Sequence, residues 1–99
     1  RATLFALAEQ VVGYCLYRDE VDYIYIRQFY IARDHRRQGL GRTAIDRLRA
    51  HEWKQTPRLR LEVLIGNQGA IAFWRAVGFA DYCLTLEAAN DLQAGGRAT

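Results

Sequence analysis

The spacing of apolar residues changes along the chain from a strand-like to a helix-like period and back. Alternating or continuous apolar runs favour strands over residues 3–8, 11–18, 21–32, 58–65 and 79–86. Helical spacing appears over residues 38–53, with an apolar stripe at Leu40, Ala44, Ile45 and Leu48. A second helix is expected over residues 68–77, between Asn67 as N-cap and Gly78 as C-terminal stop.

The order β-β-β-α-β-α-β predicts an α/β (α+β) fold built on a mixed, mostly antiparallel sheet. A tight turn at Glu9-Gln10 joins the first two strands. In the third strand, Ile24 and Ile26 share one parity, whereas Phe29 and Ile31 share the other. One extra residue near Arg27-Gln28, a β-bulge, would bring all four side chains to one face. The alternative is a central strand that is buried on both faces.

Composition indicates one globular domain over residues 1–99, because 51% of the residues are hydrophobic and 12% are aromatic. Residues 88–99 are expected to form a flexible tail. Cys15 and Cys83 lie in strand-like runs without metal-binding spacing, so we expect a reduced cytoplasmic protein with no metal and no disulfide. No apolar span suggests a membrane. The chain contains no methionine and begins at Arg1, so we expect it to be part of a longer polypeptide.

The most informative segment is the loop before the first helix, with Arg36, Arg37, Gln38, Gly39, Gly41 and Arg42. Its glycines allow the backbone to approach a ligand closely, and a helix start offers free N–H groups to an anion. Positive side chains are unfavourable at a helix N-terminus, so this cluster favours a pyrophosphate cradle over merely solvated charges. Arg42 is also expected to pair with Asp46 one helical turn later. The net charge of +3 and the scattered arginines do not indicate a nucleic-acid partner.

Two sequence blocks resemble GNAT N-acetyltransferases. Residues 29–41 resemble the acetyl-CoA-binding signature, and a later block resembles another family motif, at Leu61-Glu62-Val63, Asn67, Ala70, Phe73, Trp74, Gly78 and Phe79. The resemblance implies that backbone N–H groups from Arg37 to Arg42 hold the diphosphate of coenzyme A. The main chain of Phe29, Tyr30 and Ile31 would pair with the pantetheine arm. This strand would part from the strand over residues 58–65, and Asn67, Ala70 and Phe73 would complete the cofactor site.

The resemblance also implies direct acetyl transfer to a primary amine, with Glu62 accepting the amine proton. The alternative for Glu62 is simple pairing with Arg58 and Arg60. Trp74 stands where many members carry a tyrosine that protonates the leaving thiolate, and an indole N–H only donates a hydrogen bond. Core packing is therefore the favoured role for Trp74, and Tyr30 and Tyr82 are candidate substitutes for the missing acid. A non-catalytic acyl-CoA-binding module is the alternative function.

The acceptor is expected to be a small molecule or a peptide with a primary amine. Tyr23 and Tyr25 would line its pocket or pack across strands. Family members usually carry a strand and two helices before the first strand seen here. An upstream segment or a second copy in a homodimer would then supply the acceptor side of the site; the alternative is that the chain is a minimal version of the fold.

Overall fold

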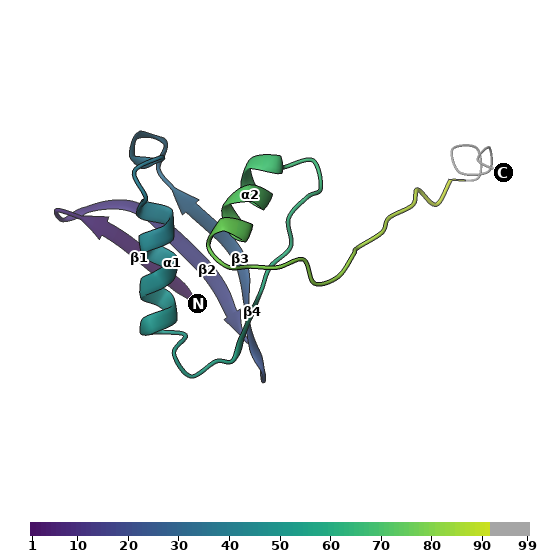
Figure 1. Cartoon of the computed structure of the whole chain (residues 1–99), viewed down its shortest axis with the longest axis horizontal. Coiled ribbons are helices and arrows are strands. Elements are labelled where there is room, and N and C mark those ends of the chain that lie inside the picture. Colours follow the sequence, from purple (N-terminus) through teal and green to yellow (C-terminus); the bar gives the residue numbers. More distant parts are fainter. Residues whose placement is uncertain (92–99) are drawn as a thin grey trace.

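A four-stranded sheet with two helices packed on one face forms the protein (Figure 1), in a computed structural model that describes residues 1–91. The strands are β1 (Ala2–Leu7), β2 (Gln10–Asp19), β3 (Tyr23–Ile31) and β4 (Arg58–Arg60). They are ordered β1-β2-β3-β4; the first two neighbouring pairs are antiparallel, and β3 and β4 are parallel. The helices are η1 (Arg33–His35, a 3-10 turn), α1 (Leu40–Ala50) and α2 (Gln68–Ala76). The predicted mixed fold is confirmed.

The predicted bulge is present in β3. Leu16 of β2 lies opposite Gln28, whereas the next residue, Tyr17, lies opposite Ile26. Arg27 is therefore the extra residue, and the parity of the strand changes there. As a result, the two isoleucines before the bulge and Ile31 after it are all buried. Burial on both faces is excluded, because Gln28 and Tyr30 are exposed.

The core lies between the sheet and the two helices. Trp53, which follows α1, meets Tyr17 edge-on with ring centroids 5.3 Å apart. Burial also raises the pKa of the Cys15 thiol to about 12. One buried cluster joins residues from β2, β3, α1, α2 and the segment after α1: Cys15, Tyr17, Ile24, Ile26, Ile45, Leu48, Trp53, Trp74 and Val77. The two helices are thereby fixed on the same face of the sheet.

Local signals located both ends of α2. Asn67 caps α2 by accepting a 3.1 Å hydrogen bond from the Ala70 N–H. Gly78 ends the helix with φ +109°, and the Phe79 N–H donates to the Trp74 carbonyl in a Schellman arrangement. The first turn lies one residue earlier than predicted, because Ala8 and Glu9 take the positive φ angles. Helix α1 is shorter than residues 38–53, since Gly39 adopts a left-handed conformation and turns replace the helix after Ala50.

The prediction of a full fourth strand over residues 58–65 was wrong. The ladder between β3 and β4 joins Tyr23, Ile24 and Tyr25 to Arg58, Leu59 and Arg60, and then stops. Leu61 and Val63 still pack against the core, but Leu64 and Ile65 are 84% and 85% exposed. The chain thus leaves the sheet after three paired residues, and β3 and β4 diverge.

The prediction of a final strand over residues 79–86 was also wrong. This segment belongs to no ladder in the structure, and Tyr82, Leu84 and Leu86 are largely exposed. A strand needs a neighbour with free backbone groups, and β4 ends before the two segments could pair. Side chains make the contacts instead, with Arg60 donating to the Tyr82 hydroxyl at 3.1 Å. Residues 88–91 of the expected tail are exposed, and residues 92–99 lie outside the described part.

Candidate functional site

The first turn of α1 presents backbone N–H groups at one end of the molecule. The Thr43 N–H makes the first helical bond, to the Gly39 carbonyl, and no side chain caps the helix. The N–H groups of Leu40, Gly41 and Arg42 therefore have no acceptor within residues 1–91. The first turn also contains no acidic residue. Such a terminus favours an anion.

The side chains of the preceding loop hold it in shape. Arg36 Nε donates to the Ile31 carbonyl at 2.8 Å, and its guanidinium lies 5.4 Å from the centre of the Tyr30 ring. Gln38 Nε2 donates to the Asp34 carbonyl at 3.3 Å. Two of the predicted ligand-binding residues thus brace the loop with their side chains, while its backbone stays available.

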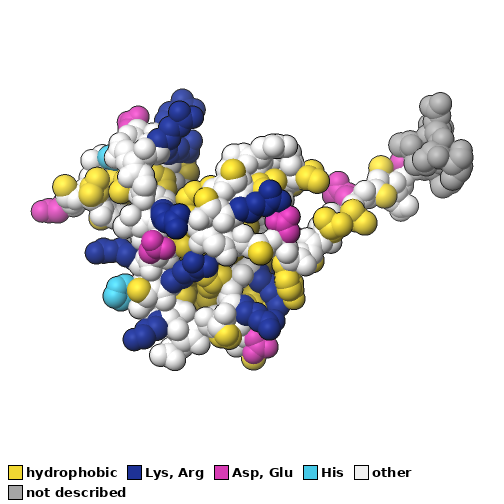
Figure 2. All heavy atoms as spheres, viewed as in Figure 1, with side chains coloured by type: hydrophobic (Ala, Val, Ile, Leu, Met, Phe, Trp, Pro, Cys, Tyr) yellow, Lys and Arg dark blue, Asp and Glu magenta, His cyan; other side chains and the backbone are white. Residues whose placement is uncertain are grey.

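Arg42 and Arg37, the other two arginines of the loop, differ in their side-chain contacts. Arg42 Nη1 donates to the Ala76 carbonyl at 3.0 Å, so this side chain joins α1 to the end of α2. The predicted Arg42–Asp46 ion pair is not formed, because the carbonyl takes the guanidinium. Arg37 is exposed and makes no side-chain bond within the described residues. Figure 2 shows positively charged side chains gathered at this tip of the molecule.

The two glycines of the loop have different structural roles. Gly39 has φ +76° and open space around it, so its freedom is conformational. At Gly41, a Cβ atom would lie 2.9 Å from Cε1 of Phe73. Gly41 therefore lets α1 approach α2 closely, a role that the sequence pattern alone does not reveal.

The proposed slot for the coenzyme arm corresponds to the divergence of β3 and β4. Beyond Tyr25, the β4 side of β3 has no paired strand within the described residues. Phe29, Tyr30 and Ile31 lie in this unpaired stretch, at the end of β3 that leads through η1 to the start of α1 (Figure 1). The Phe29 side chain packs inward, stacking on Phe73 at 5.8 Å, so only its main chain is offered to a ligand.

Asn67, Ala70 and Phe73 all have structural roles in α2. Asn67 and Ala70 form the helix cap described above. Phe73 packs against the core and meets Trp74 edge-on at 5.0 Å. Asn67 and Ala70 lie at the start of α2 and Phe73 in its second half, and the side chains of Asn67 and Phe73 are engaged within the protein.

Glu62 lies just beyond the point where β3 and β4 separate. Its carboxylate accepts a 2.8 Å hydrogen bond from the Tyr25 hydroxyl and a 3.1 Å bond from the Thr85 hydroxyl. The expected alternative, pairing with Arg58 and Arg60, does not occur. The sequence indicated Tyr25 as a pocket-lining or cross-strand packing residue and gave no indication of Thr85, because neither contact with Glu62 has a local signal.

The hydroxyls of Tyr25 and Thr85 affect the ionisation of Glu62. The bond from Tyr25, and next the bond from Thr85, lower the pKa of Glu62. The same bond to Glu62 raises the pKa of Tyr25. Glu62 is thus a carboxylate at neutral pH, and Tyr25 is a neutral phenol.

Trp74 belongs to the core. It is 9% exposed, and its ring meets those of Phe29, Phe73 and Phe79 at 5.3, 5.0 and 5.0 Å. Of the two candidate substitutes for an acid, Tyr30 stacks near Tyr14 and Arg36, and Tyr82 lies against Arg60. Neither hydroxyl contacts Glu62.

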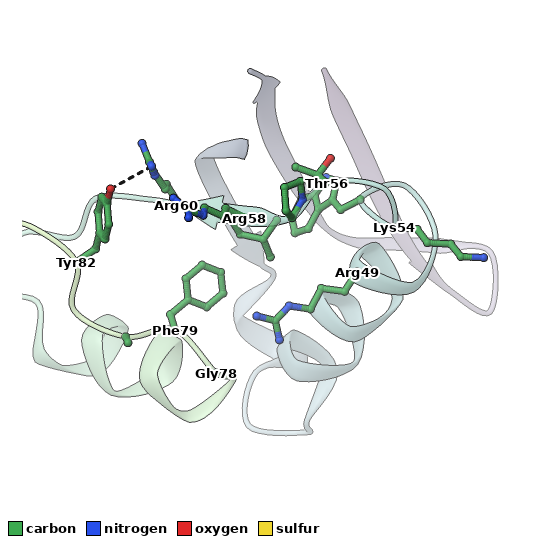
Figure 3. A pocket seen from close by; sticks show the side chains of 12 residues that line it. Arg49, Lys54, Thr56, Arg58, Arg60, Gly78, Phe79 and Tyr82 are labelled. Atoms are coloured by element: carbon green, nitrogen blue, oxygen red, sulfur yellow. Dashed lines mark hydrogen bonds between the residues drawn. The ribbon is translucent and has the colours of Figure 1, made fainter. Parts of the chain in front are cut away.

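A cavity of about 530 Å³ lies where β4, the end of α1 and the chain after α2 meet (Figure 3). Its charged lining residues are all cations: Arg49, Lys54, Arg58 and Arg60. Arg49 Nη1 donates to the Val77 carbonyl at 3.0 Å. None of the predicted cofactor-binding residues lines this cavity, so it is separate from the cradle.

Neither a metal cluster nor a membrane-spanning helix occurs among the described residues. No group of three or more His, Cys, Asp or Glu side chains within them could hold a metal ion. Across the same part of the chain, each helix is too short or too polar to cross a membrane.

An uncapped helix N-terminus beside two diverging parallel strands characterises this α+β domain, and such a terminus favours an anionic ligand. The model of the Acetyltransferase (GNAT) family matches residues 2–79, and the chain therefore belongs to this family. None of the curated proteins matches the sequence.

Solved structures with the same fold support this assignment. An acetyltransferase from Thermus thermophilus is 35% identical, with a TM-score of 0.70, over 81% of this chain and 53% of that one. Ard1 from Thermoplasma volcanium is 27% identical, with a TM-score of 0.70, over 81% and 55%. The aminoglycoside N-acetyltransferase AAC(6')-Iy, solved with CoA, is 12% identical, with a TM-score of 0.71, over 91% and 75%. The chain thus spans 53%, 55% and 75% of the length of these three structures.

Proposed function

We propose that the protein transfers an acetyl group from acetyl-CoA directly to a primary amine. The observation that carries this proposal is the divergence of β3 and β4 beside the uncapped N-terminus of α1. Membership of the GNAT family and the CoA complex of a structural neighbour support it further. Both cysteines are free thiols, which fits a reducing compartment such as the cytoplasm.

The cradle would bind the diphosphate through backbone groups. The N–H groups of Leu40, Gly41 and Arg42 point out of the first turn of α1, and Arg37 is the arginine with an uncommitted guanidinium. The unpaired edge of β3 at Phe29, Tyr30 and Ile31 would hydrogen-bond the pantetheine amides as an added strand does. Acetyl-CoA supplies the activated acetyl thioester.

Glu62 would accept the proton that the amine loses. The amine nitrogen attacks the thioester carbon, the carbon–sulfur bond breaks, and the acetyl group ends in an amide. Because the pKa of Glu62 is lowered, the carboxylate is ionised but weakly basic, so a bridging water suits the transfer. Trp74 is buried in the core, so the departing thiolate would take its proton from solvent or from a tyrosine such as Tyr30 or Tyr82.

The acceptor side of the site would include residues beyond those described above. We infer that a preceding segment or a second copy of the chain completes it, since the chain spans only part of its structural neighbours. A small molecule or a peptide amine is the proposed acceptor. Two structural neighbours are aminoglycoside acetyltransferases, but at 12% and 15% identity they indicate the shared fold alone.

Binding and turnover are tested separately. Acetyl-CoA at about a hundred times its Kd should raise the free energy of unfolding by roughly 2.7 kcal/mol. Arg37→Gln should weaken this effect, whereas Arg47→Gln, on the exposed side of α1, should not. The absence of stabilisation by acetyl-CoA would refute the proposal.

Turnover is followed as release of free thiol with a panel of amines. Glu62→Gln should lower kcat by roughly 100-fold. Glu52→Gln, at an exposed position after α1, is the matched control and should leave kcat unchanged. Stabilisation by acetyl-CoA without thiol release from any amine would identify the alternative, a non-catalytic acyl-CoA-binding module.

A further inference from the structure

Glu62 lies on the face of the sheet opposite the helices. Leu59 and Leu61 pack against the core, so the alternating residues Arg58, Arg60 and Glu62 point to the other side. Tyr25 shares that side, because its neighbours Ile24 and Ile26 are buried in the core. The hydrogen bond between Tyr25 and Glu62 joins the two strands there.

Arginines surround Tyr23 and Tyr25 on this face. Arg18 lies opposite Tyr25 in the ladder, and its guanidinium is 4.7 Å from the centre of the Tyr25 ring. Arg27, at the bulge, is close enough to act electrostatically on the Tyr25 hydroxyl. Arg60 lies opposite Tyr25 on the β4 side, and its guanidinium is 4.2 Å from the Tyr23 ring centre.

The positive charge on this face is poorly compensated. Arg18 pairs with Glu20 at 3.1 Å. Arg27, Arg58 and Arg60 form no ion pair within residues 1–91. Glu62 is held by two neutral hydroxyls rather than by an arginine. We call Arg18, Arg27, Arg58 and Arg60 the acceptor-face arginines.

We infer that the acceptor carries a negatively charged group, a carboxylate, close to the amine that is acetylated. This inference rests on the proposed function, because it assumes that the amine approaches Glu62. The acceptor-face arginines repel a second ammonium group on the acceptor and attract a carboxylate. Polycationic amines are therefore disfavoured.

Two kinds of molecule carry this chemistry, a free acidic amino acid and a peptide with acidic residues after its N-terminus. The test uses C-terminally amidated tetrapeptides of equal length: Ala-Asp-Asp-Ala, Ala-Ser-Ser-Ala and Ala-Lys-Lys-Ala. Free glutamate is tested as well, to distinguish a free amino acid from a peptide as the acceptor. Spermidine is the polycationic acceptor in the comparison. Dissociation constants for the protein loaded with coenzyme A are measured beside kcat/KM with acetyl-CoA.

We expect the acidic peptide to bind more tightly than the neutral one, and the lysine peptide least tightly. The double variant Arg27→Glu, Arg58→Glu should reduce the preference for the acidic over the lysine peptide by roughly three- to tenfold, mainly through KM. High salt should weaken the preference in the wild type. Arg47→Glu, the same charge reversal at a single exposed position on the helix side, should leave the preference unchanged.

The outcomes separate this inference from the proposed function. Equal or tighter binding of the lysine peptide or spermidine, or a preference that the double variant does not change, would overturn the acceptor class. Selective binding of an acidic acceptor that is never acetylated would support the acceptor class and refute the transferase activity.

Discussion

Replacing Gly41 by alanine tests whether this glycine serves helix packing as well as ligand binding. The added Cβ would lie 2.9 Å from Cε1 and 3.0 Å from Cζ of Phe73. The Phe73 ring cannot move freely, since it stacks on Phe29 and meets Trp74 edge-on. Forcing an extra methyl group into such packing costs about 1–3 kcal/mol. The gain in helix propensity from glycine to alanine is about 0.5–1 kcal/mol, so we expect net destabilisation of roughly 1 kcal/mol.

Gly69 provides a matched control in the same molecule. It is the second residue of α2, as Gly41 is of α1, but a Cβ there would meet no atom within 4 Å. Gly69→Ala should therefore be neutral or stabilising by up to about 1 kcal/mol. Both variants gain about the same helix propensity. The difference between their free energies of unfolding therefore reports the contact of the added methyl group with Phe73.

Denaturant unfolding of both variants without ligand gives the free energies directly. A difference of about 1 kcal/mol corresponds to roughly 4–8 °C in Tm for a domain of this size. Phe73→Leu in the Gly41→Ala background should recover part of the loss, as a double-mutant cycle would reveal. If Gly41→Ala and Gly69→Ala have the same free energy of unfolding, the packing role of Gly41 is refuted.

Three further predictions concern the site and its supports. Tyr25→Phe removes the main cause of the lowered pKa of Glu62, so the acid limb of the pH–rate profile should move to higher pH; an unmoved limb would show that Glu62 does not control the rate. Asn67→Ala removes the cap of α2 and should lower the free energy of unfolding by about 0.5–2 kcal/mol, measured with urea; no loss would contradict the capping role. Trp74→Ala should cost about 3–5 kcal/mol in the same assay, and a much smaller loss would argue against core packing.

The sequence by itself determined the features that depend on a few neighbouring residues. The parity change between Ile26 and Phe29 located the bulge, because side chains alternate along a single strand. Asn67 and Gly78 marked the ends of α2, because capping is a bond within one turn of the chain. The loop over residues 36–42 indicated an anion site for the same local reason.

Tertiary structure decided which distant groups meet. Glu62 lies 37 residues from Tyr25, and their bond exists because β3 and β4 pair in one register before they part. Because β4 ends after three paired residues, residues 79–86 have no strand partner, although their alternating apolar residues are typical of a strand. Arg42 and Gly41 acquired roles toward α2 that neither spacing nor residue type indicates. Periodicity specifies which side of an element is apolar, whereas the position of its neighbour depends on packing of the whole chain.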